Sequence, residues 1–337
     1  MRRYILGRAL TIPIVLFGIV TVAFLISHVV PANPLTSVLS PRQMENPEAV
    51  AAAEAKYGLD KPLIQQYFIY IGNLLQGDAG TSFVTKQPVA DDLRDRLPAT
   101  LELTIAAMFV AVVGGVLIGV LVAIRHNKLT DHAGRLFSLL GSSIPVYWSG
   151  LVLLLIFSVH LGWLPGPGRL DSRSVAPTDR TGFYTVDSLL DGDLEKFWEA
   201  LRHLVLPAVV LGWGVMGTVT RIVRASMLDV LGQDYVRTAR AKGARESAVV
   251  FRHAFRNAML PALTIVGFSV AYLITGAVLT ESIFSWPGIG QYSVKAAQTL
   301  DFPAIMGVCL LGGIVFLLAN FVTDIGYAFA DPRIRLS

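Results

Sequence analysis

Charged residues are scarce in this chain of 337 residues: Asp, Glu, Lys and Arg together make up 15%, whereas 53% of the residues are hydrophobic. A soluble globular domain carries about a quarter charged residues. The apolar residues are also concentrated in long runs, which excludes an ordinary water-soluble enzyme and indicates an integral membrane protein. Cysteine is nearly absent, and the single Cys309 excludes an internal disulfide framework.

Several motifs of enzymes are missing as well. No G-x-x-x-x-G-K-[ST] occurs, so the chain has no P-loop with which to bind ATP. The motifs HExxH and GxSxG are absent and the acids within the apolar runs are scattered, which argues against a membrane-embedded enzyme, and no catalytic residue is predicted. His28, His160 and His203 lie at the outer ends of apolar runs without forming a metal motif, so no metal site is predicted.

Six apolar runs are long enough for a helix that crosses the hydrocarbon core, which needs roughly 20 residues. The first run follows a cluster of arginines but exceeds the apolar region of a signal peptide, so an uncleaved span is expected. Gly141 and Pro145 predict a kink in the third run. The runs are Ala9–Val30, Ala99–Ile124, Leu136–Leu161, Leu204–Val223, Pro261–Thr280 and Phe302–Ala330.

The basic residues are sorted by side of the membrane. With the N-terminus in the cytoplasm, the inner segments hold 16 Lys and Arg against five acids, and the outer segments hold 12 against 17. The positive-inside rule therefore predicts that both termini are cytoplasmic. This sorting explains the pI of 9.2, and no nucleic-acid partner is expected. The inner segments are 1–8, 125–135, 221–257 and 331–337; the outer ones are 31–98, 162–203 and 281–301.

The outer segments differ in their expected structure. Residues 47–58 predict a helix that ends at Gly58, and residues 60–77 predict a second helix that Asp60 caps and that carries Pro62 in its first turn. The apolar face of this second helix is expected to lie on the membrane or against neighbouring spans. Residues 165–203 are rich in Pro, Gly and Asp and predict a loop. We predict two domains: 1–98, with the first span and an outer helical segment, and 99–337, a five-helix core.

The largest inner loop has a pattern of its own. Asp234–Lys242 predicts a short helix that Gly243 ends in a left-handed conformation, and Glu246–Met259 predicts a second helix. Apolar residues of the second helix are expected to face protein, and its arginines recur on a common side. A helix–Gly–helix element with one buried face and one cationic face indicates a docking element rather than a mere turn. The apolar residues are Val249, Val250, Phe255 and Met259; the arginines are Arg245, Arg252 and Arg256.

This loop carries a specific resemblance. Residues 234–261, DYVRTARAKGARESAVVFRHAFRNAMLP, resemble the EAA loop of ABC importer permeases, in which a short coupling helix fits a groove on the ATPase subunit. Gly243 stands at the invariant Gly of that loop, Ala239 at its second Ala, and Leu260–Pro261 at its closing L-P. Arg237 and Thr238 depart from the expected Glu and Ala. The dipeptide/oligopeptide/nickel branch of the family shares these departures.

Further segments resemble the same branch, so the likeness runs nearly end to end. It implies an all-α integral membrane protein with six transmembrane helices and both termini inside. It also implies the type I ABC importer permease fold with a cytoplasmic coupling helix, in the bacterial cytoplasmic membrane. The segments are YGLDKPLIQQYFIYIGNLLQGDAGTSF (57–83), PVADDLRDRLPATLEL (88–103), ESIFSWPGIGQYSVKAAQTLDFPAIMG (281–307) and DPRIRL (331–336).

The resemblance also implies a function and partners. The chain would be the translocation subunit of an ATP-driven importer of di- and oligopeptides, with a second homologous permease, two ATP-binding subunits and an extracytoplasmic substrate-binding protein. It would hold no cofactor, since ATP binds to the partners. Nickel chelates or glutathione are alternative substrates within this branch. A self-contained secondary transporter is another alternative, but it would show inverted repeats, and no convincing repeat is seen. The implied coupling residues are Arg237, Ala239, Arg240, Ala241, Lys242, Gly243, Ala244 and Arg245.

Ionisable residues near or within the spans are candidates for a gate, because a charge at the centre of a helix costs about 2.5–3.5 kcal/mol on insertion scales. Glu102 and Glu281 are placed to line an outer gate or to bind a peptide amino terminus; solvation of helix ends or subunit packing is the alternative. Asp324 is expected on the inner half of the sixth span, paired with a basic residue. Arg221 and Arg224 are expected to extend to the inner surface as structural residues.

Overall fold

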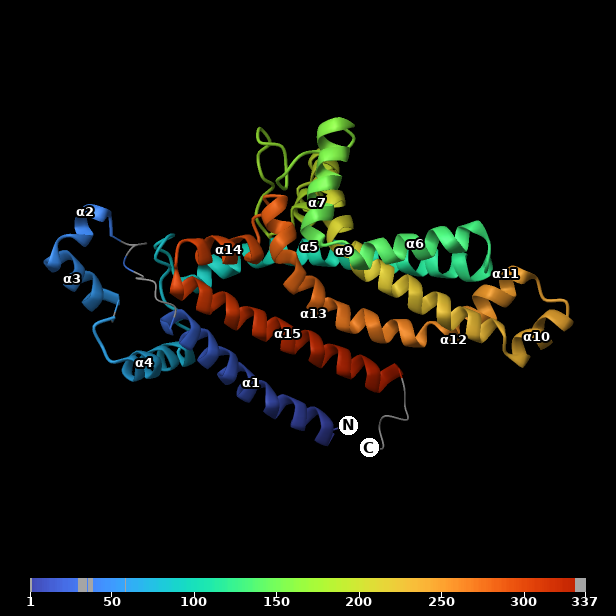
Figure 1. Cartoon of the computed structure of the whole chain (residues 1–337), viewed down its shortest axis with the longest axis horizontal. Coiled ribbons are helices and arrows are strands. Elements are labelled where there is room, and N and C mark those ends of the chain that lie inside the picture. Colours follow the sequence, from blue (N-terminus) through green and yellow to red (C-terminus); the bar gives the residue numbers. More distant parts are fainter. Residues whose placement is uncertain (1, 30–34, 36–38, 58, 331–337) are drawn as a thin grey trace. The chain divides into compact units, whose positions relative to one another are not determined.

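The computed structural model describes the backbone of residues 2–29, 35, 39–57 and 59–330 (Figure 1). The side chains of 2–10, 28–29, 56–57, 264, 271, 275 and 322–330 lie outside this description. Apart from one bridge between Thr81 and Pro88, the regular structure of the described residues is helical. The elements are α1 (Arg2–Val29), α2 (Pro41–Met44), α3 (Pro47–Tyr57), α4 (Leu63–Leu75), α5 (Val89–Ile124), α6 (Leu129–Ser143), α7 (Val146–Leu154), the π-helical η2 (Leu155–His160), α8 (Tyr184–Leu190), α9 (Leu194–Leu231), α10 (Asp234–Ala241), α11 (Glu246–Ala248), the π-helical η3 (Val249–Ala254), α12 (Phe255–Ala258), α13 (Leu260–Ile283), α14 (Ile289–Gln298) and α15 (Phe302–Ala330).

The chain divides into two compact units. The first comprises Met1–Ala99 and Pro287–Leu317, and the second comprises Thr100–Trp286 and Leu318–Ser337. The two predicted domains were continuous ranges, whereas the first unit also takes in residues far along the chain. It therefore combines the N-terminal helices with α14 and the first part of α15.

Most of each predicted span is helical in the part of the chain that the structure describes. Among the described residues, α5, α9 and Phe302–Phe321 of α15 are each long and apolar enough to cross a membrane. Two bent pairs of helices, Leu129–Ser143 with Val146–His160 and Glu246–Ala258 with Leu260–Ile274, would each supply one more crossing. Helix α1 contributes a shorter apolar stretch. The number of crossings and the orientation of the chain remain predictions.

Two long helices begin earlier than hydropathy predicted. Helix α5 begins at Val89, so Pro98 lies inside it rather than before it. Helix α9 begins at Leu194, so the end of the segment predicted as loop is helical. The side chain of Asp193 accepts a hydrogen bond from the backbone N–H of Lys196 at 2.9 Å and thereby caps α9. Hydropathy detects the apolar part of such a helix and misses its polar turns.

The third predicted span is broken rather than kinked. Helices α6 and α7 meet at Ile144–Pro145, and the two arms that flank this point are bent by 111° (Figure 1). Proline has no N–H and forces the residue before it away from helical angles, and Ile144 accordingly has φ −81° and ψ 129°. Pro145 then serves as the N-cap residue of α7.

The outer helices of the first unit match the prediction in place but not in their caps. The N-cap position of α4 is held by Pro62, and no side chain caps this helix, so the predicted role of Asp60 is wrong. The carbonyl of Pro62 accepts hydrogen bonds from the N–H groups of Gln65 and Gln66, at 2.8 and 3.1 Å, and this starts the helix without a side chain. Gly58, predicted to end the preceding helix, lies outside the described residues.

Helix α4 packs on α1 through aromatic rings. The ring of Phe24 lies 5.2 Å from that of Tyr67 and 6.1 Å from that of Tyr70, and Met306 of α15 belongs to the same cluster. Ile64 and Phe68 of the predicted apolar face of α4 are exposed, whereas Ile71 and Leu74 are half-buried. Cys309 is also exposed.

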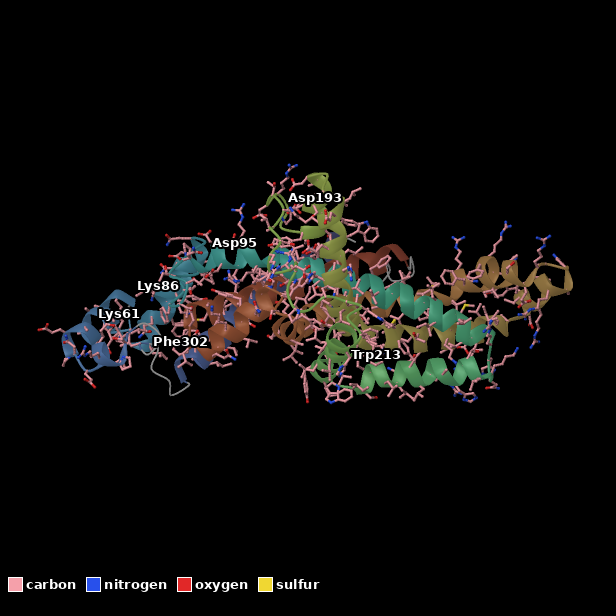
Figure 2. All side chains as sticks on the ribbon, turned by 90° about the horizontal axis from the view of Figure 1, so that it is seen from above. Lys61, Lys86, Asp95, Asp193, Trp213 and Phe302 are labelled. Carbon is pink, nitrogen blue, oxygen red and sulfur yellow. The ribbon has the colours of Figure 1, made fainter. Side chains whose placement is uncertain are left out.

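Helix α9 is the centre of the second unit and packs against α6, α7 and α13, and its glycines bring it close to α5 as well. Two glycines allow the closest approaches. A Cβ atom at Gly212 would lie 2.6 Å from the carbonyl oxygen of Ala107 on α5, and one at Gly217 would lie 2.5 Å from that of Ser138 on α6. Such contacts between small residues are typical of packed helices in membranes. The middle of α9 is marked by Trp213 in Figure 2.

Candidate functional site

The loop that begins at α10 has the predicted helix–Gly–helix form. Helix α10 ends at Ala241, and Gly243 follows with φ +77°, a left-handed conformation that glycine adopts without strain. The N–H of Gly243 donates to the carbonyl of Arg240 at 2.9 Å, and the N–H of Ala244 donates to the carbonyl of Ala239 at 3.2 Å. These two bonds form a Schellman motif, so the predicted role of Gly243 in ending the helix is confirmed.

An ion pair fixes the angle between the two sides of this turn. The guanidinium of Arg240 lies across the turn from the carboxylate of Glu246, with nitrogen–oxygen distances of 2.7 and 3.2 Å. This hydrogen-bonded contact raises the pKa of the Arg240 guanidinium. Both side chains are exposed, so the pair contributes at most about 1 kcal/mol and mainly selects a geometry.

One face of the loop is buried and the other is cationic. Val236, Val249 and Val250 are buried, and α10, η3 and α12 each contact α9. Phe255 and Met259 are half-buried. The hydroxyl of Tyr235 accepts a hydrogen bond from Asn257 at 2.8 Å, which ties α10 to α12. The loop is therefore a folded element that rests on α9.

The predicted coupling residues gather around this turn. Ala239 and Ala244 are half-buried, and the other six are exposed. Arg252 and Arg256 are exposed as well, and nitrogen-tipped side chains project from this part of the chain in Figure 2. The exposed six are Arg237, Arg240, Ala241, Lys242, Gly243 and Arg245. A protruding cationic turn of this kind is suited to a groove on a partner protein that supplies acidic or polar side chains.

Glu102, a predicted gate candidate, is held in a buried ion pair. Its Oε2 lies 2.5 Å from Nη2 of Arg169, and its Oε1 accepts hydrogen bonds from the N–H and the hydroxyl of Thr185, at 2.9 and 2.7 Å. The guanidinium of Arg169 also lies over the ring of Tyr184, 3.5 Å from its centroid. Glu102 thus anchors the segment between η2 and α9 to α5. This ion pair was not predicted, because Arg169 lies in a stretch without helical or strand periodicity.

The two other gate candidates differ in what the structure describes. Glu281 is fully buried near the end of α13, and its Oε1 accepts a hydrogen bond from the hydroxyl of Thr100 at 2.7 Å. Asp324 lies within α15, but its side chain is outside the described ones. The contacts described for Glu102 and Glu281 are made to different partners, Arg169 and Thr185 for the first and Thr100 for the second.

Arg224, predicted to be structural, forms a bidentate ion pair with Asp131. Arg221 is exposed, and its guanidinium makes a 3.5 Å contact with the hydroxyl of Thr218. Asp131 is fully buried and also accepts a hydrogen bond from the N–H of Asn127 at 2.9 Å. The pair joins the start of α6 to the last third of α9, next to the point where α9 leads into α10. It was missed because its partners are 93 positions apart.

A second polar cluster organises the first unit. The Asp92 carboxylate accepts hydrogen bonds from the hydroxyl of Tyr292 at 3.0 Å and from Arg96 at 2.9 Å. Asp301 accepts hydrogen bonds from the hydroxyl of Ser82 at 2.5 Å and from the N–H of Phe83 at 3.0 Å. Burial, reinforced by the bond to Asp92, raises the pKa of the Tyr292 phenol above its usual range. These contacts join residues 80–96 to the α14 region.

Comparison with known sequences assigns this arrangement to a family of transport components. Residues 115–336 match the family described as "binding-protein-dependent transport system inner membrane component", and residues 1–104 match the family of its N-terminal part.

Individual relatives cover nearly the whole chain. The chain is 45% identical over 320 residues to the di/tripeptide transport system permease protein DppB of Pseudomonas aeruginosa, with 95% of this chain and 94% of the relative covered. It is 40% identical over 335 residues to the dipeptide transport system permease protein DppB of Alkalihalophilus pseudofirmus, with 99% and 100% covered. It is 38% identical over 338 residues to the oligopeptide transport system permease protein AppB of Bacillus subtilis, again with 99% and 100% covered.

Proposed function

The chain belongs to the family of binding-protein-dependent transport system inner membrane components, and on this premise we propose that it imports di- and oligopeptides as the translocation subunit of an ATP-driven importer. As a member of this family it is a multi-pass protein of the bacterial inner membrane with the type I ABC importer permease fold. It is a permease subunit and not itself an enzyme. The substrate class is taken from the names of relatives that match end to end.

The proposal assigns a task to each partner. A permease of this family works with other subunits. We propose a second homologous permease that completes the pathway, two subunits that bind and hydrolyse ATP, and an extracytoplasmic protein that delivers the peptide. The chain has no P-loop, so the energy of ATP must reach its helices through a contact with another protein.

The observation that supports coupling at residues 234–261 is the exposed cationic turn around Gly243. Its geometry is fixed by the Schellman motif and by the Arg240–Glu246 pair, and its buried face rests on α9. A rigid element with these contacts transfers a movement of the ATPase to α9, whereas a flexible loop would absorb it. Glu102, Glu281 and Asp324 stay candidates for gate residues, which uptake by the corresponding amide variants tests.

Uptake by reconstituted transporter tests both parts of the proposal. The chain is reconstituted with its co-purified partner subunits and the binding protein in proteoliposomes, and entry of a labelled dipeptide is measured. Uptake that requires ATP hydrolysis and is unaffected by dissipation of ion gradients supports the importer. Uptake that follows an ion gradient without ATP would instead establish a secondary transporter.

Charge reversal at the turn tests the coupling assignment. The variants Lys242→Glu and Arg245→Glu should lower ATP-driven uptake severalfold while the chain remains inserted. Arg252→Glu is the matched control, because Arg252 is exposed on the same loop but lies outside the turn. Equal effects of all three substitutions would show that only the overall charge of the loop matters, and the assignment to the turn would then be wrong.

A further inference from the structure

One cluster of potential metal ligands lies in the second unit, apart from the coupling loop. Glu199 and His203 are one helical turn apart on α9, and Asp171 lies in the segment between η2 and α8. One ligand atom from each of the three residues lies within 4.8 Å of the other two. Nε2 of His203 is 3.4 Å from Oδ1 of Asp171, and the backbone N–H of Asp171 donates to Oε1 of Glu199 at 2.8 Å.

His203 presents Nε2 to this cluster in the form that binds metals. Its Nδ1 lies 3.0 Å from the carbonyl oxygen of Gly168. A carbonyl only accepts, so Nδ1 carries a proton, and whenever the ring is neutral its lone pair is on Nε2. The side chain of His203 is 2% exposed, and Nε2 has no hydrogen-bond partner among the described residues. Histidines that bind metals commonly donate their second nitrogen to a backbone carbonyl in this way.

The carbonyl that orients His203 is itself held in place. The N–H of Gly168 donates to the carbonyl of Phe284 at 2.8 Å, and Gly168 has φ +112°, which favours glycine. The next residue, Arg169, is fixed by its buried pair with Glu102. The imidazole is therefore supported by a rigid outer layer of contacts, which is a condition for a defined metal site.

We propose that Asp171, Glu199 and His203 bind a divalent transition-metal ion of the zinc class. One imidazole and two carboxylates give three protein ligands and leave a coordination position for water. The imidazole favours zinc over magnesium or calcium, which prefer all-oxygen sites. The side chain of Asp171 is 71% exposed, so the ion reaches the cluster from solvent.

This site goes beyond the proposed transport function and does not depend on it. A bound ion would fasten the segment that carries Asp171 to α9, as a structural link. The proposed metal site also differs from the prediction made from the sequence, which was that the chain holds no metal. Glu199 and His203 stand at the spacing that places two ligands on one helical face. Their partner Asp171 lies 28 positions before Glu199, so the three residues do not form a short sequence motif from which the site could be predicted.

Zinc binding by the purified full-length chain tests the proposal. The chain carries a tag without histidine and the substitution Cys309→Ser, so that neither a tag nor the single thiol competes for metal. After removal of metals with a chelator, Zn²⁺ is titrated in competition with a chromophoric chelator. We expect one site per chain, with affinity for Zn²⁺ at least about tenfold weaker in Asp171→Asn and in His203→Gln.

Two controls keep the outcome clear. Glu195→Gln removes an exposed carboxylate one turn before Glu199 on the same helix and should leave zinc affinity unchanged. Asp171 is exposed, so Asp171→Asn should keep the metal-free unfolding temperature even where His203→Gln does not. Zinc binding that persists in Asp171→Asn, or that falls equally in Glu195→Gln, would overturn the proposal, as would the absence of zinc binding by the parent chain.

Discussion

Arg224 of α9 and Asp131 of α6 face each other as a bidentate ion pair, with Nε 2.7 Å from Oδ1 and Nη2 2.9 Å from Oδ2. Asp131 is fully buried, and the start of α6 is thereby fastened to α9 in addition to the close backbone contact at Gly217. Without Arg224 the buried Asp131 carboxylate would keep only a longer contact to the guanidinium of Arg135, at 3.5 Å. A buried charge that loses its main partner costs far more than the pair contributes when intact.

Loss of the Arg224 side chain should therefore destabilise the second unit. For Arg224→Leu we expect the free energy of unfolding to fall by about 2–3 kcal/mol, between the values for exposed and fully buried pairs. Arg221→Leu, one turn earlier and exposed, is the control and should have little effect. The midpoint of thermal unfolding in detergent measures both. The double variant Asp131→Asn with Arg224→Leu should recover part of the loss, and a double variant as unstable as Arg224→Leu would contradict this account.

The backbone conformation of Gly243, rather than the space around it, should decide which substitutions the coupling turn accepts. No atom lies within 4 Å of a Cβ built at Gly243, but its φ of +77° costs other residues about 1–2 kcal/mol. Asn tolerates this conformation better than Val does. We expect ATP-driven uptake to decrease in the order Gly, Asn, Val at position 243.

Gly232 supplies the matched control for this series. It caps the C-terminus of α9 with φ −80°, an angle that any residue adopts. Gly232→Ala should leave uptake unchanged, whereas Gly243→Ala should reduce it. If Val at position 243 supported full uptake, the left-handed turn would not be needed for coupling.

Removal of the Arg169 side chain should loosen the segment between η2 and α8. Arg169→Met leaves the Glu102 carboxylate buried without its counter-charge, a change that costs about 3–5 kcal/mol in buried pairs. Hydrogen exchange should accelerate at Thr185, whose N–H donates to the same carboxylate. Arg173→Met, an exposed residue of the same segment, should change neither exchange nor stability. If hydrogen exchange at Thr185 were equally fast in Arg169→Met and Arg173→Met, the assignment of Glu102 as the anchor of this segment would be wrong.

The phenol of Tyr292 should make stability depend on pH in the alkaline range. Its pKa is raised in the folded chain by burial and by the hydrogen bond to Asp92, whereas in the unfolded chain it ionises near its usual value of about 10. Above that value the unfolded state loses the proton first, so stability that is fully present below pH 10 is lost as the pH rises. The unfolding midpoint between pH 8 and 11 should fall less steeply for Tyr292→Phe. Tyr235→Phe, which removes an exposed phenol, should keep the slope of the parent chain.

Features that depend on local chemistry were predictable from the sequence. Apolar runs located the long apolar helices because a bilayer demands length, although the number of crossings stays a prediction. Gly243 was recognised because few other residues end a helix with positive φ. The position of the break at Pro145 followed from its missing N–H, but its 111° angle depends on what α6 and α7 pack against. The starts of α5 and α9 were misplaced because polar turns of a helix carry no hydropathy signal.

Features that depend on distant contacts were not predictable. Glu102 was recognised as an unusual acid, yet nothing in the sequence pointed to Arg169, 67 positions away, as its partner. The same holds for Asp131 with Arg224 and for Asp171 with His203. A single sequence indicates which residues are costly to bury, and only the folded chain shows which partner offsets the cost.

Helix α9 joins several of these sites in one element. Its 38 residues run from Glu199 and His203 near one end, past Pro207 and Arg224, to the turn into α10 at the other. Pro207 has no backbone N–H to donate to the turn before it, and a proline at such a position kinks a helix. The arm of α9 that leads to the coupling turn and the arm that carries the metal cluster therefore meet at a weak point, and a tilt imposed on α10 by a partner protein would bend α9 at Pro207 before it moved the metal cluster.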